Sequence, residues 1–266
     1  MKRMGSFERA VLGRTGLEVG RLGVGSTFGV PAAALERAFE QGVNYFYWGT
    51  YRRRAFAEGL RNLAPQRPRF VLVVQSYARM ASLIGPSVER ALRELRFDYA
   101  DVLLLGLWGR LPWARILEAC RKLKERGLVR FLGLSTHRRA LVPEIAGGAD
   151  FDLFHLRYNA VHAGAERDVF PRLPAENRPG IVAFKATCSR KLLGHRRIPK
   201  HERTPAAGDC YRFVLSQPAV DVSMTGPATA AQMEHALEAL RRGPMSDAEL
   251  AWMRRIGDAI YGKPRA

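Results

Sequence analysis

Short apolar segments alternate with amphipathic segments along almost the whole chain, and this alternation constrains the fold more than any other feature of the sequence. The apolar segments are rich in Val, Leu, Ile and Phe at successive positions, which is typical of strands buried on both faces, as in a parallel sheet covered by helices. The segments expected to form strands are Leu22–Ser26, Val43–Tyr47, Phe70–Gln75, Val102–Leu105, Val129–Leu134, Phe151–His155, Ile181–Phe184 and Val220–Met224.

Between these segments, apolar residues recur three or four positions apart with charged residues on the other side, as in helices that cover a sheet. The clearest cases are Pro31–Gln41, Ser87–Arg96, Trp113–Arg126 and Ala230–Arg242. About eight strands alternating with about eight helices predict an α/β fold, a (β/α)8 TIM barrel, and 266 residues suit a single domain over residues 1–266. A doubly wound open sheet is the competing fold, but the glycines of 23–29 only loosely resemble its phosphate-binding loop.

Two segments lie outside the eightfold pattern. Residues Phe7–Leu22 predict an N-terminal β-hairpin around a turn at 12–16. Residues Ser246–Ile260 predict an extra C-terminal helix, because Ser246 and Glu249 have the spacing of a capping box. We expect both segments to plug or flank the barrel.

The chain is strongly basic, with 43 Lys and Arg residues against 25 Asp and Glu residues and a net charge of +18. This charge suits phosphates, nucleic acid or an anionic membrane, although a general bias toward Arg, Ala, Gly and Pro produces it equally well. We expect a small-molecule substrate, with an anionic one as an option, and no nucleic-acid or membrane partner. The sequence leaves the oligomeric state open.

No segment predicts export or membrane insertion. No apolar run approaches the roughly 18 residues that a membrane-spanning helix needs, and no apolar stretch follows the basic N-terminus. Cys120, Cys188 and Cys210 are far apart and predict neither a disulfide framework nor a metal site. We therefore expect a cytoplasmic protein that holds no metal.

Several short motifs occur in a collinear order that resembles the aldo-keto reductase superfamily over nearly the whole chain. They are Leu12–Val19 with Leu22–Gly25, Gly42–Phe46, Ser87–Leu95 with Asp98–Leu104, Gly127–Ser135, Arg157–Asn159, Gly180–Ala183 and Gly226–Leu237. The resemblance implies a barrel enzyme that transfers hydride to or from NAD(P)(H) without a Rossmann domain. It also implies an Asp, Tyr, Lys and His tetrad at the ends of the second to fourth strands, in which the tyrosine is the general acid.

This sequence departs from the tetrad at nearly every position. Tyr47 stands at the aspartate position, and Arg52 stands at the tyrosine position, with Tyr51 one residue early. Gln75 or Ser76, followed by Tyr77, replaces the lysine, and Gly106 replaces the histidine. The resemblance therefore implies a divergent member with a non-standard proton donor. The candidate catalytic residues are Tyr51, Tyr47, Tyr77 and the loop residue His137.

The cofactor half of the motif is better preserved, and the resemblance implies NADP(H), with NAD(H) as the open alternative. Ser135, His155 and Phe184 match the residues that hold and stack on the nicotinamide. The phosphate-side and adenine-side positions are Ser189, Arg190, Lys191, Leu192, Gly226, Gln232 and His235. Arginines and lysines after the second, fifth and seventh strands make the expected mouth of the barrel basic, which suits phosphates.

Three hypotheses about function follow. The first is an NAD(P)H-dependent aldo/keto reductase-like oxidoreductase that acts on a carbonyl-like small molecule with a non-standard proton donor. The second is an enzyme of the same fold with non-redox chemistry of the lyase or dehydratase kind. The third is a catalytically silent member that binds nucleotide. The retained cofactor positions favour the first hypothesis, and the missing tetrad favours the other two.

Overall fold

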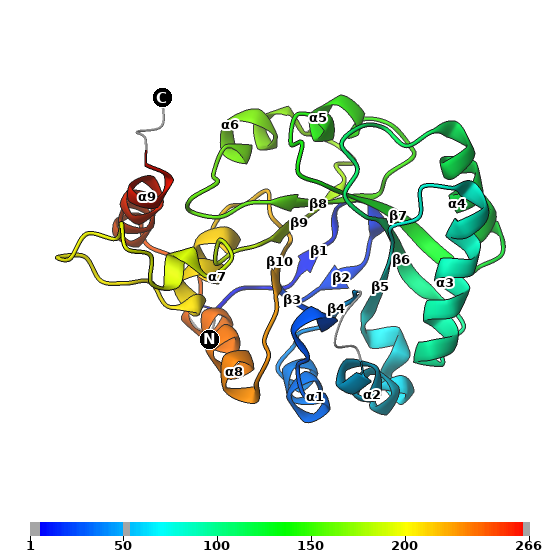
Figure 1. The fold of residues 1–266 in the computed structure, drawn as a ribbon, viewed down its shortest axis with the longest axis horizontal. Helices are drawn as coiled ribbons and strands as arrows, with labels where there is room; N and C mark the ends of the chain where they lie inside the picture. Colours follow the sequence, from blue (N-terminus) through cyan, green and yellow to red (C-terminus); the bar gives the residue numbers. More distant parts are fainter. Residues whose placement is uncertain (1–5, 50–53, 263–266) are drawn as a thin grey trace.

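The computed structural model describes residues 6–49 and 54–262, in which eight parallel strands close into a barrel surrounded by helices (Figure 1). Around the barrel the strands follow the order β10-β3-β4-β5-β6-β7-β8-β9. Their bounds are β3 Leu22–Gly25, β4 Tyr45–Trp48, β5 Val71–Ser76, β6 Ala100–Leu105, β7 Val129–Thr136, β8 Leu153–Arg157, β9 Gly180–Phe184 and β10 Val222–Thr225. The predicted barrel is confirmed, and each strand overlaps its predicted segment.

Helices follow the strands and cover the outside of the barrel (Figure 1). The α-helices are α1 Ala32–Glu40, α2 Arg54–Asn62, α3 Ala81–Leu95, α4 Ala114–Glu125, α5 Leu141–Ile145, α6 Ala165–Asp168, α7 Ala207–Leu215, α8 Ala230–Arg242 and α9 Asp247–Tyr261. Short 3₁₀ helices are η1 Gly13–Thr15, η2 Ser26–Phe28, η3 Ala64–Arg69, η4 Phe170–Arg172 and η5 Lys191–Leu193.

Helix α3 begins six residues before its predicted start at Ser87. Pro86, which lacks an amide hydrogen, lies directly before the predicted segment, and proline inside a helix removes a hydrogen bond. In the structure the helix passes through Pro86, and Ile84 and Val88 are both fully buried on one face of it. Burial of that apolar face stabilises the early turns and outweighs the one lost hydrogen bond.

The predicted N-terminal hairpin is confirmed and closes one end of the barrel. It pairs β1 Ala10–Val11 with β2 Glu18–Val19. Leu12 and Val19 are fully buried among side chains that point into the barrel, including Tyr45 and Val182. The turn requires glycine at position 13, because its φ is +46° and a Cβ there would lie 2.1 Å from the Gly180 nitrogen.

Buried carboxylates hold this N-terminal end of the barrel together. Asp101 at the start of β6 accepts a hydrogen bond from the Leu72 amide (2.9 Å) and pairs with Arg67 (2.8 Å) and Arg130 (2.9 Å). In barrels of this kind the N-terminal end serves stability, and the loops at the carboxyl ends of the strands carry the chemistry. The functional site is therefore expected at the opposite end.

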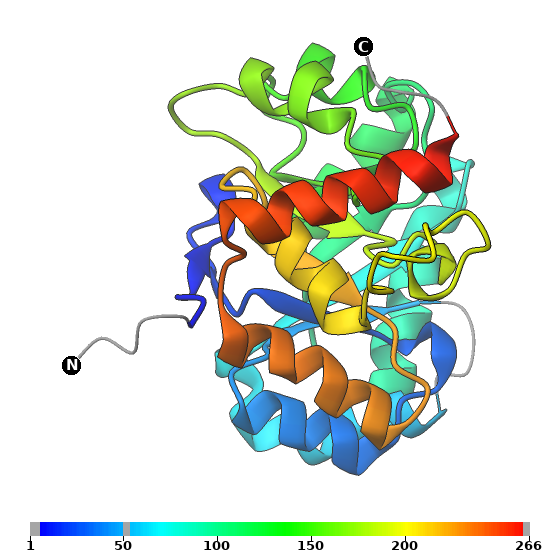
Figure 2. The ribbon, with the colours of Figure 1, turned by 90° about the vertical axis from the view of Figure 1, so that its left-hand side faces the viewer.

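Helix α9 is the predicted C-terminal helix, and it crosses α7 beside the loop that follows β9 (Figure 2). The Ser246 hydroxyl accepts a hydrogen bond from the Glu249 amide, and the Glu249 carboxylate accepts one from the Ser246 amide, which confirms the capping box. The same carboxylate pairs with Arg212 of α7 (2.5 Å), so the cap also ties the two helices together.

Candidate functional site

The carboxyl ends of the strands bring several of the predicted site residues together. Ser135 and His155 are partners in the register of β7 and β8 and lie at the same height in the barrel wall. Tyr47 packs against the side chains inside the barrel, and Gln75 lies two residues beyond the inward-facing Val73. These side chains form the uppermost layer of the barrel interior.

His155 is held as a neutral imidazole. It is 4% exposed, and burial lowers its pKa to about 3. Its Nε2 atom lies 2.7 Å from the Tyr45 hydroxyl, whose own pKa is raised well above its usual value by burial. A neutral imidazole has one donor and one acceptor nitrogen, and Tyr45 occupies Nε2, so His155 has its Nδ1 atom left for a ligand.

Tyr47 and Tyr77 form a pair of phenols at the mouth. Tyr47 is largely enclosed and its ring centroid is 6.2 Å from that of His155, whereas Tyr77 is 43% exposed. Burial raises the pKa of Tyr47. The neighbouring Tyr77 hydroxyl, which interacts with Tyr47, raises it further. Tyr47 therefore remains protonated across the physiological range. The third candidate tyrosine, Tyr51, lies outside the described residues.

The space beside Gly106 is already filled. A Cβ built on Gly106 would lie 2.2 Å from the Gln75 Nε2 atom and 2.6 Å from the Tyr77 ring. The structure therefore has no room for a histidine side chain at position 106 in this arrangement. The Gln75 Oε1 atom is buried without a hydrogen-bond partner among the described residues, so it is an acceptor available to a ligand.

His137, directly after β7, meets Phe184, the last residue of β9. Their ring centroids are 5.3 Å apart and their planes meet at 78°, an edge-to-face contact. Burial lowers the pKa of His137, and the nearby cations Lys185 and Arg157 lower it further. His137 is therefore uncharged at neutral pH. It lies on the side of the mouth where Lys185 and Arg157 supply positive charge.

The predicted cofactor positions in the loop between β9 and α7 differ in how exposed they are. Ser189, Arg190 and Lys191 are exposed, and Ser189 and Arg190 have positive φ. Leu192 is fully buried in the core, so only its main chain remains for contact with a cofactor. Cys188 is buried too, and burial raises its pKa by more than the cations around it lower it, which suits a packing role.

The loop between β10 and α8 carries the remaining cofactor positions. Gly226 lies under the Phe28 ring, because a Cβ at position 226 would be 2.5 Å from that ring. The Gln232 side chain accepts a hydrogen bond from the Ala228 amide (2.7 Å), and His235 is exposed on α8.

Sequence reasoning missed three residues of this end of the barrel. Arg157 was noted as part of a motif at the end of the sixth predicted strand and given no role, and Gln75 was noted as a replaced position. The signal for both was the alternation of inward-facing residues, which places Gln75 in line with Val73 and Arg157 in line with His155. Phe28 has no signal in the sequence, because its position depends on how two distant loops pack.

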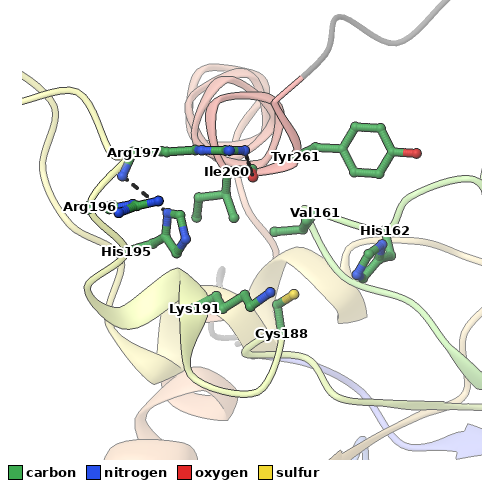
Figure 3. A pocket seen from close by; sticks show the side chains of 9 residues that line it. All are labelled: Val161, His162, Cys188, Lys191, His195, Arg196, Arg197, Ile260 and Tyr261. Carbon is green, nitrogen blue, oxygen red and sulfur yellow. Dashed lines mark hydrogen bonds between the residues drawn. The ribbon is translucent and has the colours of Figure 1, made fainter.

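Two cavities lie beside the loops that follow β8 and β9. The larger has a volume of about 300 Å³ and is lined by residues of these loops and by Ile260 and Tyr261 of α9 (Figure 3). The smaller has a volume of about 150 Å³ and lies closer to the ends of β8 and β9. His162, Cys188 and Lys191 line both cavities.

The described residues show neither a membrane-spanning helix nor a metal-ligand cluster. No helix in this part of the chain has both the length and the apolar character to cross a membrane. Within the same residues, no three His, Cys, Asp or Glu side chains are grouped as metal ligands would be.

Comparison with known proteins agrees with the barrel and its loops. The curated L-galactose dehydrogenase of Arabidopsis thaliana is 29% identical over 157 residues, which are 50% of this chain and 49% of that protein, so the chain spans about half the length of this relative. The holo form of the aldo-keto reductase AKR11C1 from Bacillus halodurans superposes with a TM-score of 0.78 at 19% identity, covering 95% of this chain and 97% of the other. An aldo/keto reductase from Klebsiella pneumoniae, solved with NADP and acetate, superposes with a TM-score of 0.76 at 22% identity and 98% coverage of both chains. A sequence model of the Aldo/keto reductase family matches residues 31–204. The chain belongs to the aldo/keto reductase family.

Proposed function

We propose that the protein is an NAD(P)H-dependent oxidoreductase of the aldo/keto reductase type that acts on a carbonyl-like small molecule, with Tyr47 as its proton donor. The observation that carries this proposal is the layer of Ser135, His155 and Tyr47 at the carboxyl ends of the strands, with Phe184 close by. These residues combine hydrogen-bonding groups for a nicotinamide with a phenol at the reacting end.

The residues at the mouth fit a nicotinamide nucleotide. Ser135 and the neutral His155 offer both donors and acceptors for a carboxamide, and the unpaired Gln75 Oε1 atom offers a further acceptor. Phe184, held by the edge of His137, offers an aromatic face. When bound, the reduced nucleotide supplies the hydride. Ser189, Arg190 and Lys191 would hold its phosphates, and Gly226, Gln232 and His235 would lie toward its adenine, as in the family pattern. The Klebsiella relative solved with NADP supports NADP(H) as the cofactor.

Tyr47 would supply the proton by a route that differs from the family's. Because its pKa is raised, Tyr47 keeps its proton in the resting protein and donates a hydrogen bond to the carbonyl oxygen. It releases the proton only as negative charge develops on that oxygen. Tyr77 is hydrogen-bonded to Tyr47 and exposed to solvent, so it provides a path by which the proton is replaced.

Turnover of the Tyr47→Phe variant tests this role. Oxidation of NADPH is measured with a panel of aldehydes, quinones and keto acids, and the best substrate is then used for the variant. We expect turnover to fall by about 10²- to 10³-fold, because a phenol that transfers a proton in the transition state contributes about that much. Tyr99→Phe is the matched control, since Tyr99 lies before β6 at the opposite end of the barrel.

Other outcomes assign the site differently. Wild-type turnover in Tyr47→Phe would remove Tyr47 from the mechanism. Nucleotide binding without turnover of any substrate would favour a catalytically silent member, and turnover that needs no nucleotide would favour lyase or dehydratase chemistry. We also propose a cytoplasmic location, which is supported by Cys120, Cys188 and Cys210 being buried and unpaired.

A further inference from the structure

We propose that the edge of the barrel formed by the loops after β5 and β6 docks on the surface of a membrane that contains anionic lipids. A protein of this kind attaches to the bilayer from outside, and no helix in the described part of the chain is suited to span it. The docking surface is a separate property of the molecule and does not depend on the proposed reaction.

Large apolar side chains are exposed on these two loops and on the first turn of α3. Of the nine large hydrophobic residues that are exposed in the described part of the chain, six lie between residues 77 and 113. Their exposed fractions range from 42% to 61%, and they are Tyr77, Met80, Leu83, Leu107, Leu111 and Trp113. We call these six residues the apolar rim. A concentration of exposed apolar side chains marks a surface that contacts a protein, a ligand or a membrane.

The two loops of the apolar rim lie side by side. They follow neighbouring strands of the barrel, and the last residues of these strands, Ser76 and Leu105, are register partners. Arg79 of the first loop donates hydrogen bonds to the carbonyls of Gly106 (2.7 Å) and Leu107 (3.1 Å) in the second. The helices that the loops lead into, α3 and α4, are neighbours on the outside of the barrel (Figure 1). The two loops therefore form one surface.

Stacked arginine and tryptophan side chains fix this surface. Arg79 lies over the ring of Trp108, 4.3 Å from its centroid. The ring of Trp108 meets that of Trp113 edge to face, with the centroids 5.6 Å apart. Arg110 lies over the ring of Trp113 at 4.3 Å. Because Trp108 is buried, it anchors the exposed Trp113. The rim is thus ordered before it docks, which reduces the entropy lost on binding.

Leu107 is held at the surface in an unfavourable backbone conformation. Its φ is +51°, in the left-handed region that glycine and asparagine adopt more readily than leucine. Its side chain is 48% exposed, so little burial offsets that cost. Such conformations persist where the surrounding structure enforces them, and they are concentrated at functional positions. The fold therefore presents an apolar side chain at a position where stability alone favours asparagine or glycine.

The two loops carry arginines and no carboxylates. Residues 77–88 and 102–117 contain neither Asp nor Glu. Arg79, Arg110 and Arg115 are exposed and have no carboxylate partner among the residues that the structure describes. Anionic lipid headgroups attract arginines that lie close to the bilayer, and the net charge of +18 adds to this attraction. Charge complementarity therefore favours an anionic membrane over a neutral one.

The composition of the rim favours a bilayer over a small ligand. Tryptophan and tyrosine rings lie at the headgroup level of membranes, while leucine side chains enter the apolar layer beneath and arginines lie among the headgroups. Neither of the two cavities described above is lined by a residue of the rim, whereas a small ligand is usually enclosed in a concave site. The anionic leaflet of a cell membrane is the cytoplasmic one, which agrees with the proposed location.

Docking would place the mouth of the barrel beside the lipid headgroups, because Tyr77 of the rim is also the neighbour of Tyr47. The sequence led to the expectation of no membrane partner. It contains no long apolar segment, and the residues of the rim are spread over two loops that only the fold brings together.

Sedimentation with lipid vesicles tests the proposal. We compare phosphatidylcholine alone with phosphatidylcholine that contains about 30% phosphatidylserine, at about 0.1 M salt. We expect the wild type to bind the anionic vesicles, and the double variant Leu107→Asn, Leu111→Asn to bind them about tenfold more weakly or less, because two apolar side chains no longer enter the bilayer. Asparagine tolerates the φ of position 107, so the variant should fold. Val11→Asn is the matched control, because Val11 is 56% exposed on the hairpin at the opposite end of the barrel.

Charge variants test the contribution of the arginines. We expect Arg110→Gln and Arg115→Gln each to weaken binding to the anionic vesicles about fivefold. Arg79 is left unchanged because its hydrogen bonds join the two loops. Arg93→Gln is the matched control, because Arg93 is exposed in the last turn of α3, away from the rim, and should leave the affinity within about twofold.

Tryptophan fluorescence shows which surface meets the lipid. Trp113 is exposed, whereas Trp48, Trp108 and Trp252 are buried. Brominated lipids should therefore quench the wild type, and Trp113→Phe should remove most of that quenching while the protein still sediments with the vesicles.

Three results would overturn the proposal. The first is no binding of the wild type to anionic vesicles. The second is binding that the double leucine variant leaves unchanged, which would show general attraction by the net charge. The third is a double variant that binds vesicles normally and has only a raised KM for a carbonyl substrate, which would place the rim in the substrate site.

Discussion

Gly106 is closely packed by Gln75 and Tyr77 at the mouth of the barrel. The Gln75 amide and the Tyr77 ring occupy the space that a histidine side chain would need at this position. The resemblance to the family implies a histidine at position 106 and a lysine at Gln75 or its neighbour, so these two replacements would fit one another. The mouth is a different, internally consistent arrangement of polar side chains.

His155 predicts a pH dependence of stability. Its pKa is about 3 in the folded protein and about 6.5 in the unfolded chain, so only the unfolded chain takes up a proton between these values. The contribution of His155 to the free energy of unfolding is fully present above pH 6.5 and is lost as the pH is lowered toward 3. At pH 5 we expect this residue to reduce the free energy of unfolding by about 1–2 kcal/mol relative to pH 7.

Urea unfolding of wild type and His155→Gln at pH 7 and pH 5 measures this contribution. Glutamine can keep a hydrogen bond to Tyr45 but does not titrate, so the variant should lose less stability between the two pH values than wild type. Equal losses in the two proteins would show that His155 is not held neutral by the fold.

Helix α9 depends on one carboxylate for both its cap and its attachment. Glu249 caps the helix, pairs with Arg212, and has its pKa lowered to about 2, first by hydrogen bonds from Arg212. The Arg212 side chain is only 5% exposed and also donates to the carbonyls of Gly243 and Pro244. Without Glu249, a nearly buried guanidinium would lose its counter-charge.

We expect Glu249→Gln to lower the free energy of unfolding by about 1–3 kcal/mol at pH 7. The difference from wild type should stay constant above pH 4.5, where Glu249 is ionised in both states, and shrink as the pH falls toward 2. Glu118→Gln is the matched control, because Glu118 and its partner Arg121 are both 52% exposed and their pairing contributes less than about 1 kcal/mol. If Glu249→Gln lowers the free energy of unfolding no more than Glu118→Gln does, the role of Glu249 in attaching α9 is contradicted.

The elements of this fold were predictable to different degrees. The strands were readable because each is buried on both faces, and the ends of the chain because a turn and a capping box mark them. The start of α3 was misplaced because burial of Ile84 outweighs the local effect of Pro86. The long loop after β9 was readable only as a basic segment, since its left-handed residues and its contact with Asn159 depend on packing between distant parts of the chain.

The residues of the candidate site also differed in how far the sequence could predict them. Ser135, His155 and Phe184 could be placed by register, because strand periodicity determines which residues share the end of a barrel. The partnership of Tyr47 with Tyr77 could not, because it joins a strand to a loop. The cavities beside the loops after β8 and β9 could not be predicted either, since they depend on how these distant loops pack.

At the scale of the whole molecule, the charge of +18 is divided between two kinds of surface. On the N-terminal end and the outer helices, arginines pair with carboxylates such as Asp101 and Glu249 and contribute to stability. Beside the mouth, Arg157, Lys185 and Lys191 have no carboxylate partner among the residues that the structure describes. Part of the excess charge thus lies where a phosphorylated cofactor would approach the barrel.

Titration of the purified protein with NADPH and with NADH, followed by tryptophan fluorescence, tests the central claim most directly. Trp48 at the end of β4 and Trp108 after β6 are both buried near the mouth and should report a nucleotide bound there. We predict saturable quenching by NADPH with a dissociation constant in the micromolar range, on the order of 1–100 μM. An unchanged signal with both nucleotides at millimolar concentration would contradict the oxidoreductase account, and the family relationship would then describe the fold alone.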